Sequence, residues 1–192
     1  MGLRLLAKEL NGLLIFETDV HKDNRGYFME TFKADEFKSL GLPSIFEQDN
    51  YSRSFAGVLR GMHFQWEPPQ GKLIRVIEGT AYFAEIDIRK GSLTFGKYFG
   101  IELSDINKKV LWVPPGFANG FVALSETVDV QYKCTTQWNG KGEGCILWND
   151  PVLGIKWPLG NPILSEKDKK GITLAEWQKK KEFDLFIFKD KN

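Results

Sequence analysis

One short segment of the chain combines residue types that proton transfer requires. Gly57 and Gly61 punctuate an apolar strand that carries Arg60 and one of the chain's two histidines, His63. An imidazole titrates near neutral pH, so it can both accept and return a proton. Taken alone, however, a histidine on such a strand is more often a hydrogen-bonded structural residue. Other residues must therefore support a catalytic interpretation.

Two further segments place polar groups in a comparable setting. A turn and a strand that carries Lys72 follow the first segment, and Val113–Gly116 then leads to Asn119. This layout resembles that of cupins, in which a histidine-bearing strand and a Pro-x-Gly-x-x-His segment line one pocket. Metal-binding cupins place histidines where Gln65 and Asn119 stand here. One imidazole and two amides hold a transition metal poorly, so we expect no metal in this pocket.

Alternating apolar and polar residues predict the strands that position these groups. One face of the strand expected over residues 128–134 carries Val128, Val130, Tyr132 and Cys134. Further strands are expected near residues 74–77, 82–88 and 111–113. Aromatic residues make up 14% of the chain, and its 19 glycines and 8 prolines favour strands joined by turns. We therefore expect an all-β fold, a cupin-type jelly-roll or β-barrel with a few short peripheral helices.

Two segments carry helix signals. The first, Thr31–Leu40, has apolar positions on one side and is followed by Gly41. The second, Thr173–Lys181, begins with a threonine and has Glu176 three residues later, which is the capping-box arrangement. Neither segment is long enough to dominate the fold, so both are expected at its periphery.

Length and composition exclude several classes of protein. The 192 residues suit a single domain, expected over 1–192, and the net charge of +1 offers no basis for capturing nucleic acid or an anionic membrane. We find no segment typical of a signal peptide and no apolar run of membrane-spanning length. Cys134 and Cys145 are too few for a disulfide framework. We expect a cytoplasmic protein with reduced thiols and a small-molecule ligand.

The wider pattern resembles the dTDP-4-dehydrorhamnose 3,5-epimerase family, cupin-type enzymes that act on nucleotide sugars in rhamnose synthesis. The similarity runs in order from about Ile15 to Asp168. The matching segments are Asp23–Glu30, Gln48–Ser52, Gly57–Gln65, Gly71–Val76, Asp87–Arg89, Ser92–Gly96, Leu103–Ser104, Pro115–Ala118, Trp148–Pro151, Gly154–Pro158 and Leu164–Asp168. No single segment is decisive, but the collinear set is specific.

The resemblance implies acid–base chemistry without a cofactor. A ketone at C4 of a sugar acidifies the hydrogens at C3 and C5, because the carbanion is delocalised as an enolate. The resemblance assigns His63 as the base, Asp168 as the residue that holds its tautomer, Lys72 as the cation beside the enolate and Tyr132 as the acid on the opposite face. General acid–base assistance typically contributes about 10²–10⁴-fold.

The resemblance also implies a nucleotide site and a homodimer. In relatives the N-terminal strands exchange between two subunits, so part of the site comes from the neighbouring chain. The substrate-binding residues that it implies, with Arg60 beside the enolate and Lys167 near the pyrophosphate, are Arg25, Glu30, Gln48, Asn50, Arg60, Asn119, Glu143 and Lys167.

One departure from the family pattern leaves the substrate open. The family's usual Gly-Phe-Ala-His-Gly is here Gly116-Phe117-Ala118-Asn119-Gly120. An amide can still donate a hydrogen bond, but it carries no charge and cannot shuttle a proton. The leading prediction is epimerisation of the dTDP-linked 4-keto-6-deoxy sugar at C3 and C5. Inversion at C3 alone, a GDP-linked heptose substrate, a metal-dependent cupin and a non-catalytic sugar-nucleotide-binding protein are the alternatives.

Overall fold

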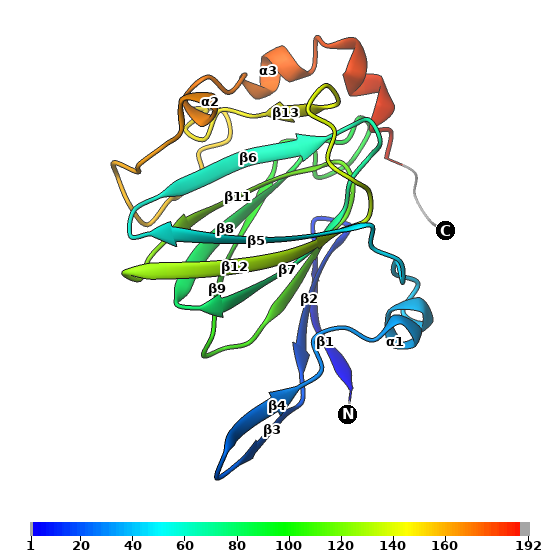
Figure 1. The fold of residues 1–192 in the computed structure, drawn as a ribbon. Coiled ribbons are helices and arrows are strands. Elements are labelled where there is room, and N and C mark those ends of the chain that lie inside the picture. Colours follow the sequence, from blue (N-terminus) through cyan, green and yellow to red (C-terminus); the bar gives the residue numbers. More distant parts are fainter. Residues whose placement is uncertain (1, 189–192) are drawn as a thin grey trace.

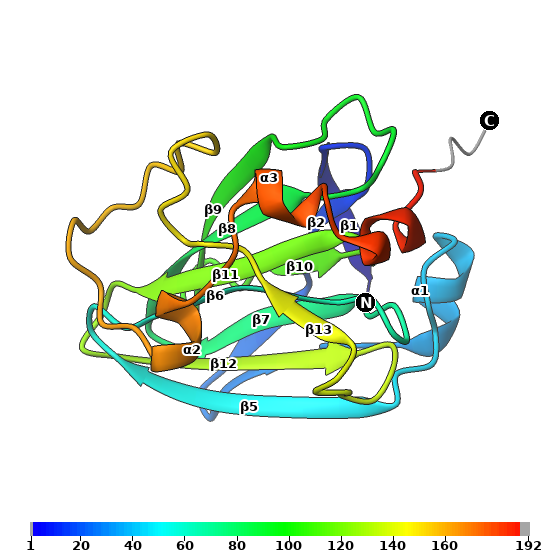
Figure 2. The same cartoon turned by 90° about the horizontal axis from the view of Figure 1, so that it is seen from above.

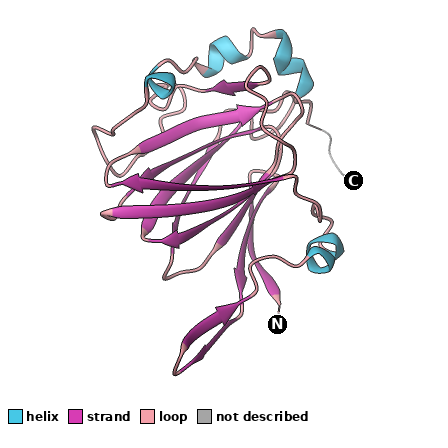
Figure 3. Cartoon of the chain, in the orientation of Figure 1, coloured by secondary structure: helices cyan, strands magenta, loops and turns pink. Residues whose placement is uncertain are grey.

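Two β-sheets face each other and enclose the main core of the protein (Figures 1 and 3). The structure is a computed structural model and describes residues 2–188. The first sheet has six strands in the order β1-β2-β10-β7-β12-β5. Its strands are β1 (Leu3–Glu9), β2 (Leu13–Thr18), β10 (Val110–Val113), β7 (Lys72–Glu78), β12 (Thr127–Cys134) and β5 (Gln48–Phe55).

The second sheet has five strands in the order β13-β6-β11-β8-β9. Its strands are β13 (Glu143–Cys145), β6 (Leu59–Gln65), β11 (Phe117–Ala123), β8 (Thr80–Asp87) and β9 (Tyr98–Ser104). A separate antiparallel hairpin, β3 (Val20–Asp23) and β4 (Gly26–Met29), projects away from both sheets as an arm (Figure 1). Most residues of the arm are exposed.

Side chains from the inner faces of the two sheets form the central core. Ile74, Val128 and Val130 of the six-stranded sheet pack in one cluster with Phe83 and Phe121 of the five-stranded sheet. The Phe83 and Phe121 rings stack with their centroids 5.1 Å apart. Burial of this apolar surface stabilises the sandwich by roughly 25 cal/mol per Å². Polar residues of the inner faces gather at one end of this core.

Short helices cover the outer faces of the sheets (Figure 2). The helix α1 (Ala34–Ser39) buries Phe37 against the outside of the six-stranded sheet. The helices α2 (Glu166–Lys169) and α3 (Leu174–Trp177), with the 3₁₀ helix η1 (Lys181–Leu185), lie over the five-stranded sheet, where Trp177 is fully buried. Among the described residues, no helix has the length and apolar character needed to cross a membrane.

The structure confirms the all-β prediction and refines it. The two sheets form a sandwich and do not close into a barrel, since each has its own strand order and residues 2–188 contain no ladder joining them. The strand expected over residues 128–134 is β12, and the capping box at Thr173 is present. The helix after it ends at Trp177, four residues before the predicted end, and α1 begins three residues later than predicted. The outermost positions of the predicted domain, 1 and 192, lie outside the described residues.

Candidate active site

A cleft of about 420 Å³ opens between the two sheets at the polar end of the core. Its lining residues are Gln48, Asn50, His63, Phe64, Gln65, Gln70, Lys72, Tyr132, Trp138 and Glu143. His63 lies on β6 of one sheet, whereas Lys72 and Tyr132 lie on β7 and β12 of the other. Groups that can transfer a proton therefore reach the cleft from two opposite walls.

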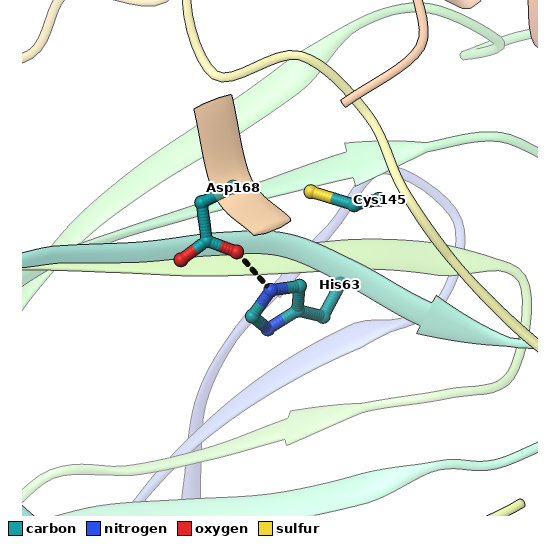
Figure 4. A group of neighbouring side chains, drawn as sticks. All are labelled: His63, Cys145 and Asp168. Carbon is teal, nitrogen blue, oxygen red and sulfur yellow. Dashed lines mark hydrogen bonds and ion pairs between the residues drawn. The ribbon is translucent and has the colours of Figure 1, made fainter. Parts of the chain in front are cut away.

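His63 and Asp168 form a hydrogen-bonded pair at the edge of this cleft (Figure 4). His63 Nε2 lies 2.6 Å from Asp168 Oδ1, and the Asp168 side chain, which comes from α2, is only 4% exposed. Burial opposes ionisation of Asp168, but the hydrogen bond and the charge of His63 outweigh it, so its pKa lies below the usual value. An ionised carboxylate only accepts hydrogen bonds, so Nε2 carries the proton. The lone pair of Nδ1, which points away from Asp168, is then free to act as a base.

Close backbone approach fixes the position of His63. Gly61 has φ +138°, and a Cβ there would lie 2.5 Å from the Cα of Gly120 on β11. Only glycine tolerates both the conformation and the contact. The two strands consequently meet closely beside the pairing of His63 with Asn119. Gly61, singled out in the sequence, thus has a structural role next to the base.

The opposite wall presents an amine and a phenol. Lys72 Nζ lies 5.7 Å from the centre of the Tyr132 ring, and neither polar group has a hydrogen bond or ion pair with a residue in the described part of the chain. Burial lowers the pKa of Lys72, because it disfavours the charged amine. Burial raises the pKa of Tyr132, with a smaller contribution from Cys134, so the phenol keeps its proton at neutral pH. Both groups are available to a ligand.

Four of the predicted nucleotide-binding residues lie at or beside the mouth of the cleft. Gln48 Nε2 donates to Asn50 Oδ1 at 2.9 Å, and the side-chain oxygen of Gln48, Oε1, accepts a hydrogen bond from the backbone N–H of Trp138. Lys167 Nζ contacts Glu143 Oε1 at 2.6 Å. These residues form a polar rim, and the exposed Trp138 ring adds an aromatic face to it.

The structure does not bring every predicted residue to the cleft. Arg25 and Glu30 lie on and just after the arm, where Arg25 is paired with Asp23 at 2.6 Å. Arg60 is exposed and donates to Ser54 Oγ at 2.9 Å, beyond the residues that line the cleft. In a single chain these three side chains do not contribute to the pocket.

Two residues near the base were not singled out for chemistry by the sequence. Cys145 Sγ belongs to a group with the ligand atoms of His63 and Asp168, all within 4.8 Å of one another (Figure 4). Burial raises the pKa of this thiol to about 12, with the charge of Asp168 adding to the shift, so the sulfur stays protonated at neutral pH. Glu85 is completely buried beside Asn119. Glu85 is two residues from Phe83 and therefore lies on the same face of its strand. The alternation of residues 82–88 thus already indicates that a glutamate points into the core.

Comparisons with known proteins give one consistent answer. Residues 7–176 match the sequence profile of the dTDP-4-dehydrorhamnose 3,5-epimerase family. The chain is similar to the enzyme of that name from Methanothermobacter thermautotrophicus, with 47% identity over 90% of this chain and 95% of the relative. It is also similar to the crystal structure of the Legionella pneumophila 3,5-epimerase in complex with dTDP-4-keto-L-rhamnose, with 39% identity, a TM-score of 0.91 and coverage of 98% and 99% of the two chains.

A third similarity concerns a different stereochemical outcome. The fold matches that of a 3'-monoepimerase from Streptomyces bikiniensis solved with dTDP-quinovose, with a TM-score of 0.86 and 27% identity over 94% of this chain and 91% of that one. The same fold thus occurs in a relative named as a 3,5-epimerase and in one named as a monoepimerase.

Proposed function

Because the chain belongs to the dTDP-4-dehydrorhamnose 3,5-epimerase family, we propose that it inverts C3 and C5 of a dTDP-linked 4-keto-6-deoxy sugar. The observation that carries this proposal is the placement of His63 and Tyr132 on opposite walls of one cleft. Inversion requires a proton to leave from one face of the sugar and return to the other. Two proton-transfer groups that face each other satisfy this requirement, whereas groups on a single wall do not.

His63 is the base in this mechanism. Its Nδ1 removes the proton next to the ketone, and the imidazolium that forms is stabilised by the Asp168 carboxylate at 2.6 Å. Asp168 holds the tautomer and the charge of His63. Tyr132 then delivers its phenolic proton to the opposite face of the carbanion. Before the next inversion the imidazolium releases its proton to solvent and the phenolate takes one up.

Lys72 stabilises the enolate that lies between these two steps. The ketone is neutral and the enolate oxygen is negative, so the buried ammonium group interacts more strongly with the intermediate than with the substrate. Only such differential binding accelerates the chemical step. Preorganised charges of this kind commonly contribute several kcal/mol to catalysis. The chemistry requires no cofactor.

The rim residues Gln48, Asn50, Glu143 and Lys167 bind the nucleotide in this proposal. Their amides, carboxylate and ammonium offer donors and acceptors for a pyrimidine, a ribose and a pyrophosphate. The complexes of the Legionella enzyme with a dTDP-sugar and of the Bacillus anthracis enzyme with TDP and pyrophosphate support a dTDP-linked substrate.

We also propose that the chain works as a homodimer in the cytoplasm. The arm leaves Tyr27 and Phe28 exposed, at 55% and 61%, which is typical of a surface covered by a partner. A second copy would place Arg25 and Glu30 against the neighbouring cleft and complete the predicted binding set. Light scattering of the purified chain tests the dimer, and Arg25→Ala should then raise KM with little change in kcat. A monomer of full activity would overturn this part.

Inversion of C3 alone is the second candidate. Asn119 replaces the histidine of the family pattern, and the Streptomyces bikiniensis enzyme named as a monoepimerase shares the fold. Proton NMR in deuterated water separates the two, with dTDP- and GDP-linked 4-keto sugars tested side by side. Deuterium at C3 and C5 of the dTDP-linked sugar is the expected result. Label at C3 only would establish the monoepimerase, and a preference for the GDP-linked sugar would overturn the assigned substrate.

A further inference from the structure

Glu85, His63 and Asn119 form a row across three neighbouring strands of the five-stranded sheet. Asn119 on β11 is the direct partner of His63 on β6 and of Glu85 on β8. Directly opposed residues project from the same face of a sheet with Cβ atoms roughly 5 Å apart. The row therefore runs from the base in the cleft, through the amide, to a carboxyl group below it.

Glu85 is the innermost polar residue of this row. Its exposed fraction is 0%, and its neighbours along and across the sheet include Phe83 and Phe99 of the aromatic core. Oε1 accepts a hydrogen bond from Asn119 Nδ2 at 2.5 Å, whereas Oε2 has no hydrogen-bond partner among the described residues. An apolar side chain at this position would avoid the desolvation of a carboxyl group. Fold stability alone does not account for a glutamate here.

The raised pKa of Glu85 bears on the role that its side chain can have. Burial raises its pKa well above the usual range, and the hydrogen bond from Asn119 and the charge of Lys72 offset only part of this effect. Burial therefore favours the neutral acid form of Glu85. Its carbonyl oxygen still accepts the hydrogen bond from Asn119, so the contact does not depend on a negative charge.

We propose that Glu85 is a positioning residue that anchors the side-chain amide of Asn119, so that the amide oxygen and the second N–H face the sugar beside His63. With one N–H held by Glu85, the amide cannot turn freely, and its remaining groups are fixed in place. The inference rests on the proposed function, since it assumes that the sugar's keto group lies in this cleft. A misplacement of about 1 Å at a reacting centre can lower a rate by roughly 10²-fold.

Three substitutions at Glu85 distinguish a positioning role from a purely structural role and from a role as a charged partner of Lys72. Glu85→Gln keeps an acceptor for Asn119 and should retain kcat within about threefold. Glu85→Met removes the acceptor but fills the same apolar space, so the protein should stay as stable as the parent while kcat falls about 10- to 100-fold and KM changes little. Glu85→Asp keeps the acid but shortens the reach, and kcat should fall as in Glu85→Met. Glu102→Met, at an exposed position on the neighbouring strand, is the matched control and should behave like the parent.

A double-mutant cycle tests whether Glu85 acts through Asn119. Asn119→Ala should lower kcat by a similar factor, and adding Glu85→Met to it should cause no further loss. The proposal would be overturned if the double variant lost kcat by the product of the two single factors. A folded Glu85→Met protein of full activity would overturn it as well. If Glu85 were instead a charged partner of Lys72, Glu85→Gln would lose as much activity as Glu85→Met, which would also refute it.

The side-chain amide resonance of Asn119 gives a readout that does not depend on turnover. Its protons should exchange slowly with solvent in the parent and in Glu85→Gln, and rapidly in Glu85→Met. Slow exchange in a parent protein that takes up no deuterium into any 4-keto sugar would refute the proposed function while leaving the anchoring intact. Equal exchange in the parent and in Glu85→Met would refute the anchoring itself.

Discussion

Replacement of Asp168 by asparagine isolates the electrostatic part of the base. The side chain is 4% exposed and contacts His63 Nε2 at 2.6 Å, so the change removes a charge without opening a cavity. An asparagine side chain keeps one oxygen, which can still accept a hydrogen bond from His63 Nε2. The tautomer with a free Nδ1 is then preserved, and what is lost is the charge that stabilises the imidazolium.

The size of the loss follows from the strength of that interaction. A hydrogen bond to a charged group contributes about 1.5–3 kcal/mol and a neutral one about 0.5–1.5 kcal/mol, so loss of the charge alone costs about 1–1.5 kcal/mol. Since about 1.4 kcal/mol corresponds to a factor of ten in rate, kcat should fall roughly 5- to 15-fold, with a smaller change in KM. Asp168→Ala also loses the hydrogen bond and should be the slower of the two.

Deuterium uptake from solvent, followed by NMR under saturating substrate, measures this loss. Glu166→Gln is the matched control, because Glu166 is an exposed carboxylate on the same short helix. A kcat for Asp168→Asn within about threefold of the parent would show that the carboxylate does not support the base. The reasoning about His63 would then be wrong, even if the enzyme remained an epimerase.

Four other perturbations give distinct results. Tyr132→Phe should still exchange the sugar proton but should lose net inversion, because the phenol that returns a proton from the opposite wall is absent; comparing deuterium uptake with product formation checks this. Lys72→Met should lower kcat by roughly 10²–10³-fold with dTDP affinity unchanged, as measured by calorimetry. Extensive dialysis against a chelator should leave the activity intact, and recovery of a lost activity by added metal would contradict the mechanism. The hydrogen bond with Arg53 is the main reason why the pKa of Asp129 is lowered to about 2. The ionised carboxylate therefore stabilises the fold above its unfolded pKa near 3.9, and this effect is lost as the pH falls toward 2. Asp129→Asn should be less stable than the parent at pH 7, and urea denaturation should show that the difference in stability shrinks in acid.

The strands and the residues that project from them were accessible to sequence reasoning. Alternation placed Tyr132 on the inward face with Val130, and the structure shows the same face. Periodicity of this kind works because successive side chains of a strand point to opposite sides. The fold class was predictable for the same reason.

Asp168 shows where local patterns fail. It lies within a run of charged residues that, without the family resemblance, predicts an exposed segment. Its burial arises because Ser165 caps the short helix and α2 packs over β6, contacts between residues far apart in the sequence. Arg25 illustrates a different limit, since a residue on a projecting arm reaches a site only if another chain supplies it.

Glu85 is marked by the sequence pattern, but its partner is not. A glutamate on the apolar face of residues 82–88 breaks the alternation, and such a break indicates either an error in the strand assignment or a buried functional group. Only the pairing of β8 with β11 shows that Asn119 is its partner. Sequence periodicity does not show in which register two strands pair when they are not neighbours in the sequence.

The central claim is that His63 removes a proton from the sugar in a cofactor-free reaction. The direct test compares the parent with His63→Ala in deuterated water, using the dTDP-linked 4-keto-6-deoxy sugar and measuring dTDP affinity in parallel. The account predicts deuterium at C3 and C5 with the parent, no uptake at either position with His63→Ala, and equal dTDP affinity for both. Deuterium uptake by His63→Ala at a rate near that of the parent would contradict it.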